Sequence, residues 1–114
     1  RMIPITAAGT VGQDAELKFS ASGTEVLSFS VACRTGFDKQ KNESKTTWVR
    51  CTMFGARAAS AEAHLKKGTK VTVSGTVNEV RAYTNKDGTP GASLEVNVND
   101  YALQGSKPAV DPFD

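Results

Sequence analysis

The chain has 114 residues, of which 39% are hydrophobic and 23% are charged, as is typical of one small globular domain. No apolar run approaches the ~20 residues that a membrane-spanning helix requires. The first residues also lack the charged and apolar regions of a signal peptide. These features exclude a helical membrane protein and predict a cytoplasmic one.

The net charge of +2 is unevenly distributed along the chain. Residues 1–86 carry 13 basic and seven acidic side chains, a balance of +6, whereas residues 87–114 carry one basic and five acidic side chains, a balance of −4. A basic body with an acidic end suggests an anionic partner for the body. On charge alone, an ordinary solvated surface is the simpler interpretation.

Alternation of apolar and polar side chains predicts a mainly β protein. The first strand is expected over residues 2–11, and a short extended piece follows at residues 17–19. The next strand, residues 27–34, has the half-buried pattern, with Leu27, Phe29, Val31 and Cys33 on its apolar face. The polar stretch over residues 36–46 indicates a long exposed loop or a hairpin.

The third strand is expected over residues 47–54, with Val49, Cys51 and Met53 on one face and Trp48, Arg50, Thr52 and Phe54 on the other. A helix follows over residues 56–67, because Ala is the best helix former and Gly68 is a natural stop. Its buried stripe is Ala58, Ala61 and Leu65, and its final Lys66 and Lys67 suit the negative helix end.

The last two strands are expected at about residues 70–83 and 92–103, joined by a hairpin turn at Asn85-Lys86-Asp87-Gly88. Gly75 lies where a barrel needs a bulge or a sharp bend. Three strands, a helix and two strands is the OB-fold order. We therefore predict an all-β domain over residues 1–104, a five-stranded OB-fold barrel with one α-helix between strands 3 and 4, and a short flexible tail over residues 105–114. The alternative is another small barrel or an α+β sheet.

The residues offer little support for catalysis or for a metal. His64 is the only histidine and has no nucleophile or acid beside it in sequence. Glycine-rich phosphate-binding motifs are absent from the sequence. Cys33 and Cys51 form no CxxC motif, and we expect both to be reduced, buried thiols. The sequence therefore predicts a protein that is not an enzyme and has no cofactor or metal.

Nucleic-acid binding is better supported. Trp48 and Phe54 share the outward face of a predicted strand with Arg50, so bases could stack on the rings while the cation holds a phosphate. Alternatively, the rings fill the barrel end or an oligomer interface, and for Phe54 this is equally plausible. Phe37 and Tyr83 lie in or beside basic, polar loops, where aromatic residues are poor core candidates. The cations expected to contact DNA are Arg34, Lys39, Lys41, Lys45, Arg50, Arg81 and Lys86.

The chain resembles the bacterial single-stranded DNA-binding proteins over roughly residues 3–105. Five short motifs in the family's order carry the resemblance: Gly12-Gln13-Asp14, Trp48-Val49-Arg50, Phe54-Gly55, Leu65-Lys66-Lys67-Gly68 and Val73-Ser74-Gly75. The resemblance implies an OB-fold that forms a homotetramer, with a dimer as the alternative, and wraps single-stranded DNA. It places the family's stacking aromatic residues at Phe37, Trp48, Phe54 and Tyr83.

The chain departs from this family at several positions. The family commonly has Trp at the positions of Phe37 and Tyr83, and often His at that of Val49, where it contacts another subunit. The family's acidic tip ends in Pro-Phe and recruits replication and repair proteins, and here Asp111, Pro112 and Phe113 resemble it. We expect sequence-independent binding and protection of single-stranded DNA in replication, recombination and repair. The alternative is a primosomal adaptor of the same fold that acts mainly through protein contacts.

Overall fold

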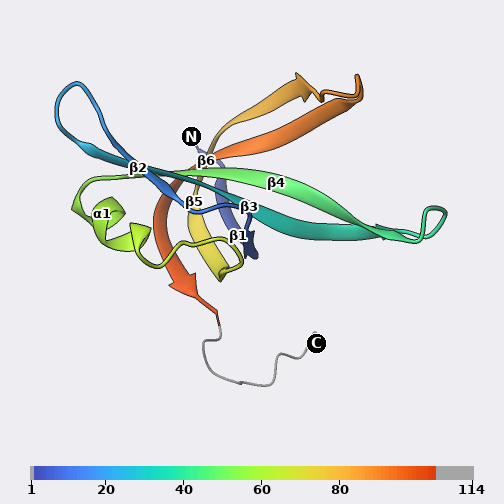
Figure 1. The fold of residues 1–114 in the computed structure, drawn as a ribbon, viewed down its shortest axis with the longest axis horizontal. Coiled ribbons are helices and arrows are strands. Elements are labelled where there is room, and N and C mark those ends of the chain that lie inside the picture. The colour runs from blue at the N-terminus through green and yellow to red at the C-terminus, as the bar shows by residue number, and fades with distance from the viewer. Residues whose placement is uncertain (1, 105–114) are drawn as a thin grey trace.

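The computed structural model describes residues 2–104, and over this range the chain forms six strands and one short helix (Figure 1). The elements in chain order are β1 (Pro4–Val11), β2 (Glu16–Phe19), β3 (Glu25–Asp38), β4 (Glu43–Phe54), α1 (Ala56–Glu62), β5 (Lys70–Thr84) and β6 (Pro90–Leu103). Within these residues, no helix has both the length and the apolar character needed to cross a membrane.

The strands close into a ring. β1 pairs with β5, β5 with β6, β6 in parallel with β4, and β4 with β3, which returns to β1 at Thr10–Ala32 and Val11–Val31. β2 pairs with β3 beyond the point where β1 leaves it, so β1 and β2 are two halves of one bent strand. The predicted five-stranded OB-fold barrel, with its helix between the third and fourth barrel strands, is therefore confirmed.

The core lies inside this ring, on the faces that the alternation predicts. The inward positions of the two central strands are all buried: Leu27, Phe29, Val31, Cys33, Val49, Cys51 and Met53. Helix α1 packs against β2, β3 and β4, and the predicted stripe of Ala58, Ala61 and Leu65 is fully buried. Both cysteines are free and buried, as predicted.

The helix is shorter than predicted, because it ends at Glu62 and not at residue 67. The segment after it is held by the chain between β1 and β2. The Leu65 carbonyl accepts a hydrogen bond from the Ala15 amide (2.9 Å), and the Lys67 amide donates to Asp14 Oδ1 (2.8 Å). These contacts draw residues 63–69 away from a helical path, so the predicted role of Lys66 and Lys67 at the helix end is wrong.

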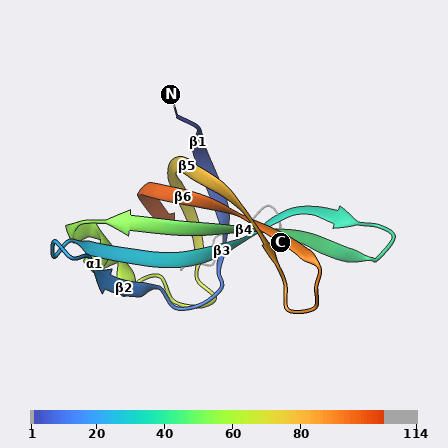
Figure 2. The ribbon, with the colours of Figure 1, turned by 90° about the horizontal axis from the view of Figure 1, so that it is seen from above.

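Two hairpin arms project from one end of the barrel (Figures 1 and 2). β3 and β4 stay paired out to Asp38 and Glu43, so the polar stretch over residues 36–46 is a hairpin with its turn at residues 39–42. β5 and β6 stay paired out to Thr84 and Pro90, and the predicted turn at residues 85–88 joins them. We call these hairpins the β3–β4 arm and the β5–β6 arm.

We predict that Gly75→Ala destabilises the fold by about 1–3 kcal/mol, as overpacking typically does. The ladder shifts register between Ser74 and Gly75, and a Cβ on Gly75 would overlap the Asn97 carbonyl group and lie 2.9 Å from the Val98 Cα. These backbone atoms cannot move aside cheaply. Gly36→Ala is the matched control, because its Cβ would meet only Lys45 Cδ at 3.7 Å. Urea unfolding measures both, and equal stabilities would contradict this view of Gly75.

We also predict that unfolding becomes easier at alkaline pH because of Cys51. Burial, with smaller effects of Cys33 and Glu95, raises the pKa of the Cys51 thiol from the ordinary 9.0 to about 12. The stabilising effect is complete below pH 9 and is lost as the pH rises toward 12, since only the unfolded chain ionises in between. From pH 8 to pH 10, the wild type should lose about 1.4 kcal/mol more stability than Cys51→Ala. Equal losses in urea unfolding would disprove this.

Candidate nucleic-acid interface

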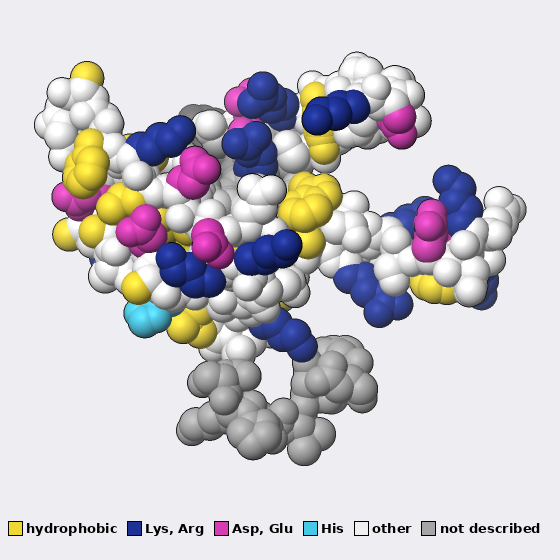
Figure 3. Space-filling model, in the orientation of Figure 1, with side chains coloured by type: hydrophobic (Ala, Val, Ile, Leu, Met, Phe, Trp, Pro, Cys, Tyr) yellow, Lys and Arg dark blue, Asp and Glu magenta, His cyan; other side chains and the backbone are white. Residues whose placement is uncertain are grey.

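A groove of about 310 Å³ lies on the outward face of the barrel where the two arms diverge. Four strands contribute to its lining, which consists of Ser30, Trp48, Arg50, Arg81, Tyr83 and Ser93. Figure 3 shows hydrophobic side chains in the notch between the projecting arms and Lys and Arg side chains on both arms. The groove therefore combines aromatic and cationic groups. This agrees with the sequence, which placed Trp48 and Arg50 on the outward face of one strand.

The register of the sheet explains why these side chains meet. Trp48 lies opposite Ala32 on β3 and Ser93 on β6, and Ser93 lies opposite Arg81 on β5. These four residues form one transverse row across four strands. Tyr83 lies opposite Gly91, which is two residues from Ser93 along β6 and therefore shares its face. The two rings thus approach each other although 35 residues separate them in sequence.

A bulge at Asn78 turns Arg81 and Tyr83 to this face. Val77 faces inward opposite Val96, but the next paired residue, opposite Glu95, is Glu79, which leaves Asn78 as an extra residue. Without that residue, the odd positions of β5 would continue the inward face of Val77. Bulges re-aim side chains in this way. The bulge therefore decides which side of the β5–β6 arm carries the aromatic ring.

The β3–β4 arm uses the same device. Arg34 lies opposite Thr46, the next pair is Gly36 with Lys45, and Thr35 is the extra residue. The shift places Phe37 opposite Ser44. Ser44, Thr46 and Trp48 alternate along one face of β4, so Phe37 and Arg34 lie on the same face of the ladder as Trp48.

The exposure of the rings suits stacking. Trp48 and Tyr83 are each 39% exposed, so each ring is partly covered by the protein and partly open to the groove. Arg81 makes no ion pair with any residue in the range 2–104. Arg50 Nε lies 3.9 Å from Glu95 Oε2, and because the Arg50 side chain is half exposed, this pair contributes at most about 1 kcal/mol.

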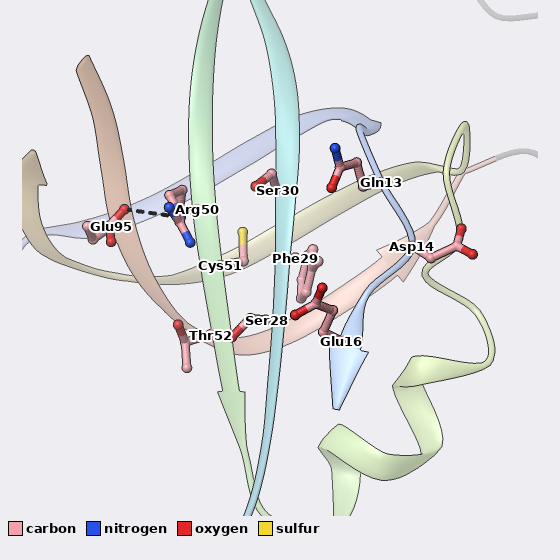
Figure 4. Close-up of a pocket in the computed structure, with 10 residues that line it drawn as sticks. All are labelled: Gln13, Asp14, Glu16, Ser28, Phe29, Ser30, Arg50, Cys51, Thr52 and Glu95. Atoms are coloured by element: carbon pink, nitrogen blue, oxygen red, sulfur yellow. Dashed lines mark ion pairs between the residues drawn. The ribbon is translucent and has the colours of Figure 1, made fainter. Parts of the chain in front are cut away.

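A second depression adjoins the groove and shares Ser30 and Arg50 with it (Figure 4). Its other walls carry the carboxylates of Asp14, Glu16 and Glu95. Of these, Glu16 pairs with Lys18 at 3.8 Å and Asp14 accepts a hydrogen bond from the Lys67 amide, and the one aromatic residue in the lining, Phe29, is buried. The basic and aromatic end of this continuous surface is therefore the end between the arms.

The structure brings four of the predicted site residues together: Trp48, Arg50, Arg81 and Tyr83. Phe54 shares the face of Trp48, but six residues along a strand place it about 20 Å away. It is 59% exposed, so it does not fill the barrel end of this chain.

The remaining predicted residues lie on the arms or outside the described range. Lys39 and Lys41 lie in the turn of the β3–β4 arm, and Lys86 lies in the turn of the β5–β6 arm. Lys45, opposite Gly36, projects from the face opposite that of Phe37. Tyr83 and Phe37, expected in or beside loops, lie on paired strands. Asp111, Pro112 and Phe113 lie outside the described residues.

Two carboxylates outside the groove accept hydrogen bonds, one in the turn of the β5–β6 arm and one near the helix. The side-chain hydroxyl and the amide of Thr89 donate to Asp87 (2.6 and 3.0 Å) and lower the pKa of its carboxyl, which fixes the turn that carries Lys86. Arg57 donates to Asp100 Oδ1 (2.6 Å) and lowers the pKa of that carboxyl, which ties α1 to β6. Arg57 is therefore engaged within the protein.

Sequence reasoning missed Ser30, Ser93 and Glu95. Ser93 is only 6% exposed, because it lies within the row, between the larger side chains of Trp48 and Arg81. Its hydroxyl donates to Glu95 Oε2 at 3.4 Å. The outward alternation of β6 was the available signal, but its pairing with both β4 and β5 was not visible in the sequence. Among residues 2–104, no group of three or more His, Cys, Asp or Glu side chains could hold a metal ion.

The chain is similar in sequence to known single-strand binding proteins. The model of the single-strand binding protein family matches residues 2–104. The chain is 37% identical over 101 residues to a single-stranded DNA-binding protein of Paenarthrobacter aurescens, covering 84% of this chain and 58% of that protein. It is 29% identical over 102 residues to single-stranded DNA-binding protein 1 of Xylella fastidiosa, covering 87% of this chain and 74% of that protein.

The fold also matches a solved structure, that of a small single-stranded DNA-binding protein from Streptomyces coelicolor. The TM-score is 0.71 at 20% sequence identity, and the match covers 90% of this chain and 94% of the other. At this identity the likeness concerns the fold. The chain spans little more than half the length of several curated relatives, such as 55% of the one from Chlamydia pneumoniae.

Proposed function

The chain belongs to the single-strand binding protein family, and on this premise we propose that it binds single-stranded DNA without regard to sequence. It protects the exposed strand during replication, recombination and repair. The observation that carries this proposal is the meeting of Trp48, Tyr83, Arg50 and Arg81 in one groove on the outward face of the barrel.

The chemistry of the groove supports binding that ignores sequence. Every base has a π-face, so a base can stack on Trp48 or Tyr83 whatever its identity, and each stacked base contributes about 1–3 kcal/mol. Arg50 and Arg81 lie in the same groove, where they can contact the phosphates that join the stacked nucleotides. Neither interaction reads a base edge.

The arms and the rest of β4 extend this surface beyond the groove. Phe37 and Phe54 offer two further exposed rings, at 48% and 59%. We assign phosphate contacts on the arms to Arg34, Lys39, Lys41, Lys45 and Lys86. A strand that leaves the groove can therefore continue along either arm or along β4 toward Phe54.

We further propose that the protein catalyses no reaction and acts in the cytoplasm, associated with the nucleoid. Labelled single strands should remain intact when incubated with the protein and magnesium.

We expect a homotetramer, with a dimer as the alternative, and native mass spectrometry distinguishes the two. Asp111, Pro112 and Phe113 are proposed to recruit replication or repair proteins.

We predict that oligo-dT quenches the fluorescence of Trp48, the only tryptophan in the chain. Trp48→Ala and Tyr83→Ala should each weaken binding of a labelled oligo-dT by about 1–3 kcal/mol, because each removes one stacking platform. Val80→Ala is the matched control, since Val80 is 69% exposed on the same arm but pairs with Leu94 on the opposite face. Absence of quenching and unchanged affinity in both aromatic variants would rule out the proposed groove.

We also predict that affinity falls as salt rises, with a slope of about −0.7 per phosphate neutralised. Arg81→Gln should reduce the magnitude of that slope by about 0.7, because it removes one cation from the groove. Lys66→Gln is the control, because Lys66 is exposed after α1 and does not line the groove. Anisotropy titrations at several salt concentrations give the slopes, and identical slopes for both variants would remove Arg81 from the phosphate contacts.

A further inference from the structure

We propose that Gly12 and Gly91 are positioning residues that fix the two aromatic rings of the groove in the orientation that a base requires, with Gly91 forming a flat seat under the face of Tyr83 and Gly12 lying against the edge of Trp48. This inference rests on the proposed function. Neither glycine contributes a side chain to the surface, and each acts through the ring that it contacts, Trp48 at Gly12 and Tyr83 at Gly91.

Tyr83 lies face down on Gly91. A Cβ added to Gly91 would lie 2.7 Å from both Cε2 and Cζ of the ring and 2.9 Å from Cε1. Nearly equal distances to three adjacent ring atoms place that position under the ring face, since an approach from the edge would bring one atom much closer than the others. The ring therefore crosses from β5 onto the bare backbone of its cross-strand partner.

Trp48 meets Gly12 with the edge of its indole, because only two adjacent carbons of the ring lie within 4 Å of the Cβ position. A Cβ on Gly12 would lie 2.7 Å from Cζ3 and 3.0 Å from Cη2 of the indole. The Gly12 amide donates to the Ser30 carbonyl at 3.0 Å, so the backbone beside the ring edge is held against β3. This glycine lies in the chain that joins β1 to β2, outside the strand that carries Trp48.

Backbone conformation does not explain either glycine. Gly23, Gly55, Gly68 and Gly88 have positive φ angles and open space where a Cβ would be. Gly12 and Gly91 show the reverse, because their φ angles are ones that any residue adopts while the Cβ position is occupied by a ring. The missing side chain is therefore required by the ring alone.

These contacts have a direct consequence for stacking. The Tyr83 ring is covered by backbone on one face and has the other face open, so it offers stacking for one base, whereas the backbone of Gly12 limits the position of the Trp48 edge. Ordinary contact begins at 3.4 Å, so a methyl group at 2.7 Å must push either ring outward by at least 0.7 Å. A ring held in its binding orientation loses little freedom when a base arrives, and this preorganisation strengthens binding.

The test is a pair of double-mutant cycles on the full chain, read by anisotropy of labelled oligo-dT at one salt concentration. Gly91→Ala should weaken binding by about fivefold, the low end of one stacked base, and Gly12→Ala by a similar factor. In a Tyr83→Ala background, Gly91→Ala should have no further effect, and the same holds for Gly12→Ala in a Trp48→Ala background. Gly36→Ala, whose Cβ makes only an ordinary contact, is the control.

A second measurement separates positioning from stability. Gly12→Ala should shift the emission of Trp48 in the free protein, whereas Gly91→Ala should leave it unchanged. Thermal unfolding checks each variant, and Gly91, which lies on an arm outside the barrel core, keeps the proposal testable if Gly12→Ala fails to fold.

The outcomes are distinct. If the wild type does not bind oligo-dT, the proposed function itself fails. If the wild type binds and the aromatic variants bind weakly, but the glycine variants match Gly36→Ala, the positioning roles are wrong and the groove stands. A glycine effect that persists in the alanine backgrounds would also overturn the proposal, because the glycine would then act by another route.

Discussion

The two-residue alternation of side chains around a closed ring of strands is the constraint on which the rest of this structure depends. Closure leaves one face of every strand for the core and the other for solvent. Leu27, Val49 and Val73 are fully buried or nearly so on the inner face, and Trp48 and Arg50 are consequently held on the outer one. The stability of the core and the exposure of the groove are two results of the same register.

Each of the two arms breaks this alternation once, and the break turns aromatic side chains toward the groove. A single extra residue at the base of each arm, Thr35 and Asn78, reverses the side-chain faces beyond it. Tyr83 and Phe37 thereby lie on the face of Trp48 and not on the inward one. Both arms remain fully paired, so this reversal involves no loss of the ladder beyond one residue in each arm.

The distribution of charged side chains also distinguishes the two ends of the outward surface. The outward surface of the barrel carries cations and rings between the arms but three carboxylates around the adjoining depression, with Arg50 shared between the two. A phosphate chain is attracted to the cations between the arms. The backbone of Gly91 beneath Tyr83 and that of Gly12 beside Trp48 add a fixed ring orientation to this electrostatic preference, and stacking depends on that orientation.

The sequence by itself determined the strand order, the inward faces, the hairpin at residues 85–88 and the candidacy of Trp48, Arg50, Arg81 and Tyr83, because periodicity and residue type are local properties. Only the tertiary structure decided that Tyr83 meets Trp48, that the helix stops at Glu62, and that Gly91 lies beneath one ring and Gly12 against the edge of the other. The bulge at Asn78 has no glycine or proline beside it, and the parallel pairing of β4 with β6 joins segments more than 40 residues apart. Such contacts arise from closure of the whole ring, which no local pattern encodes.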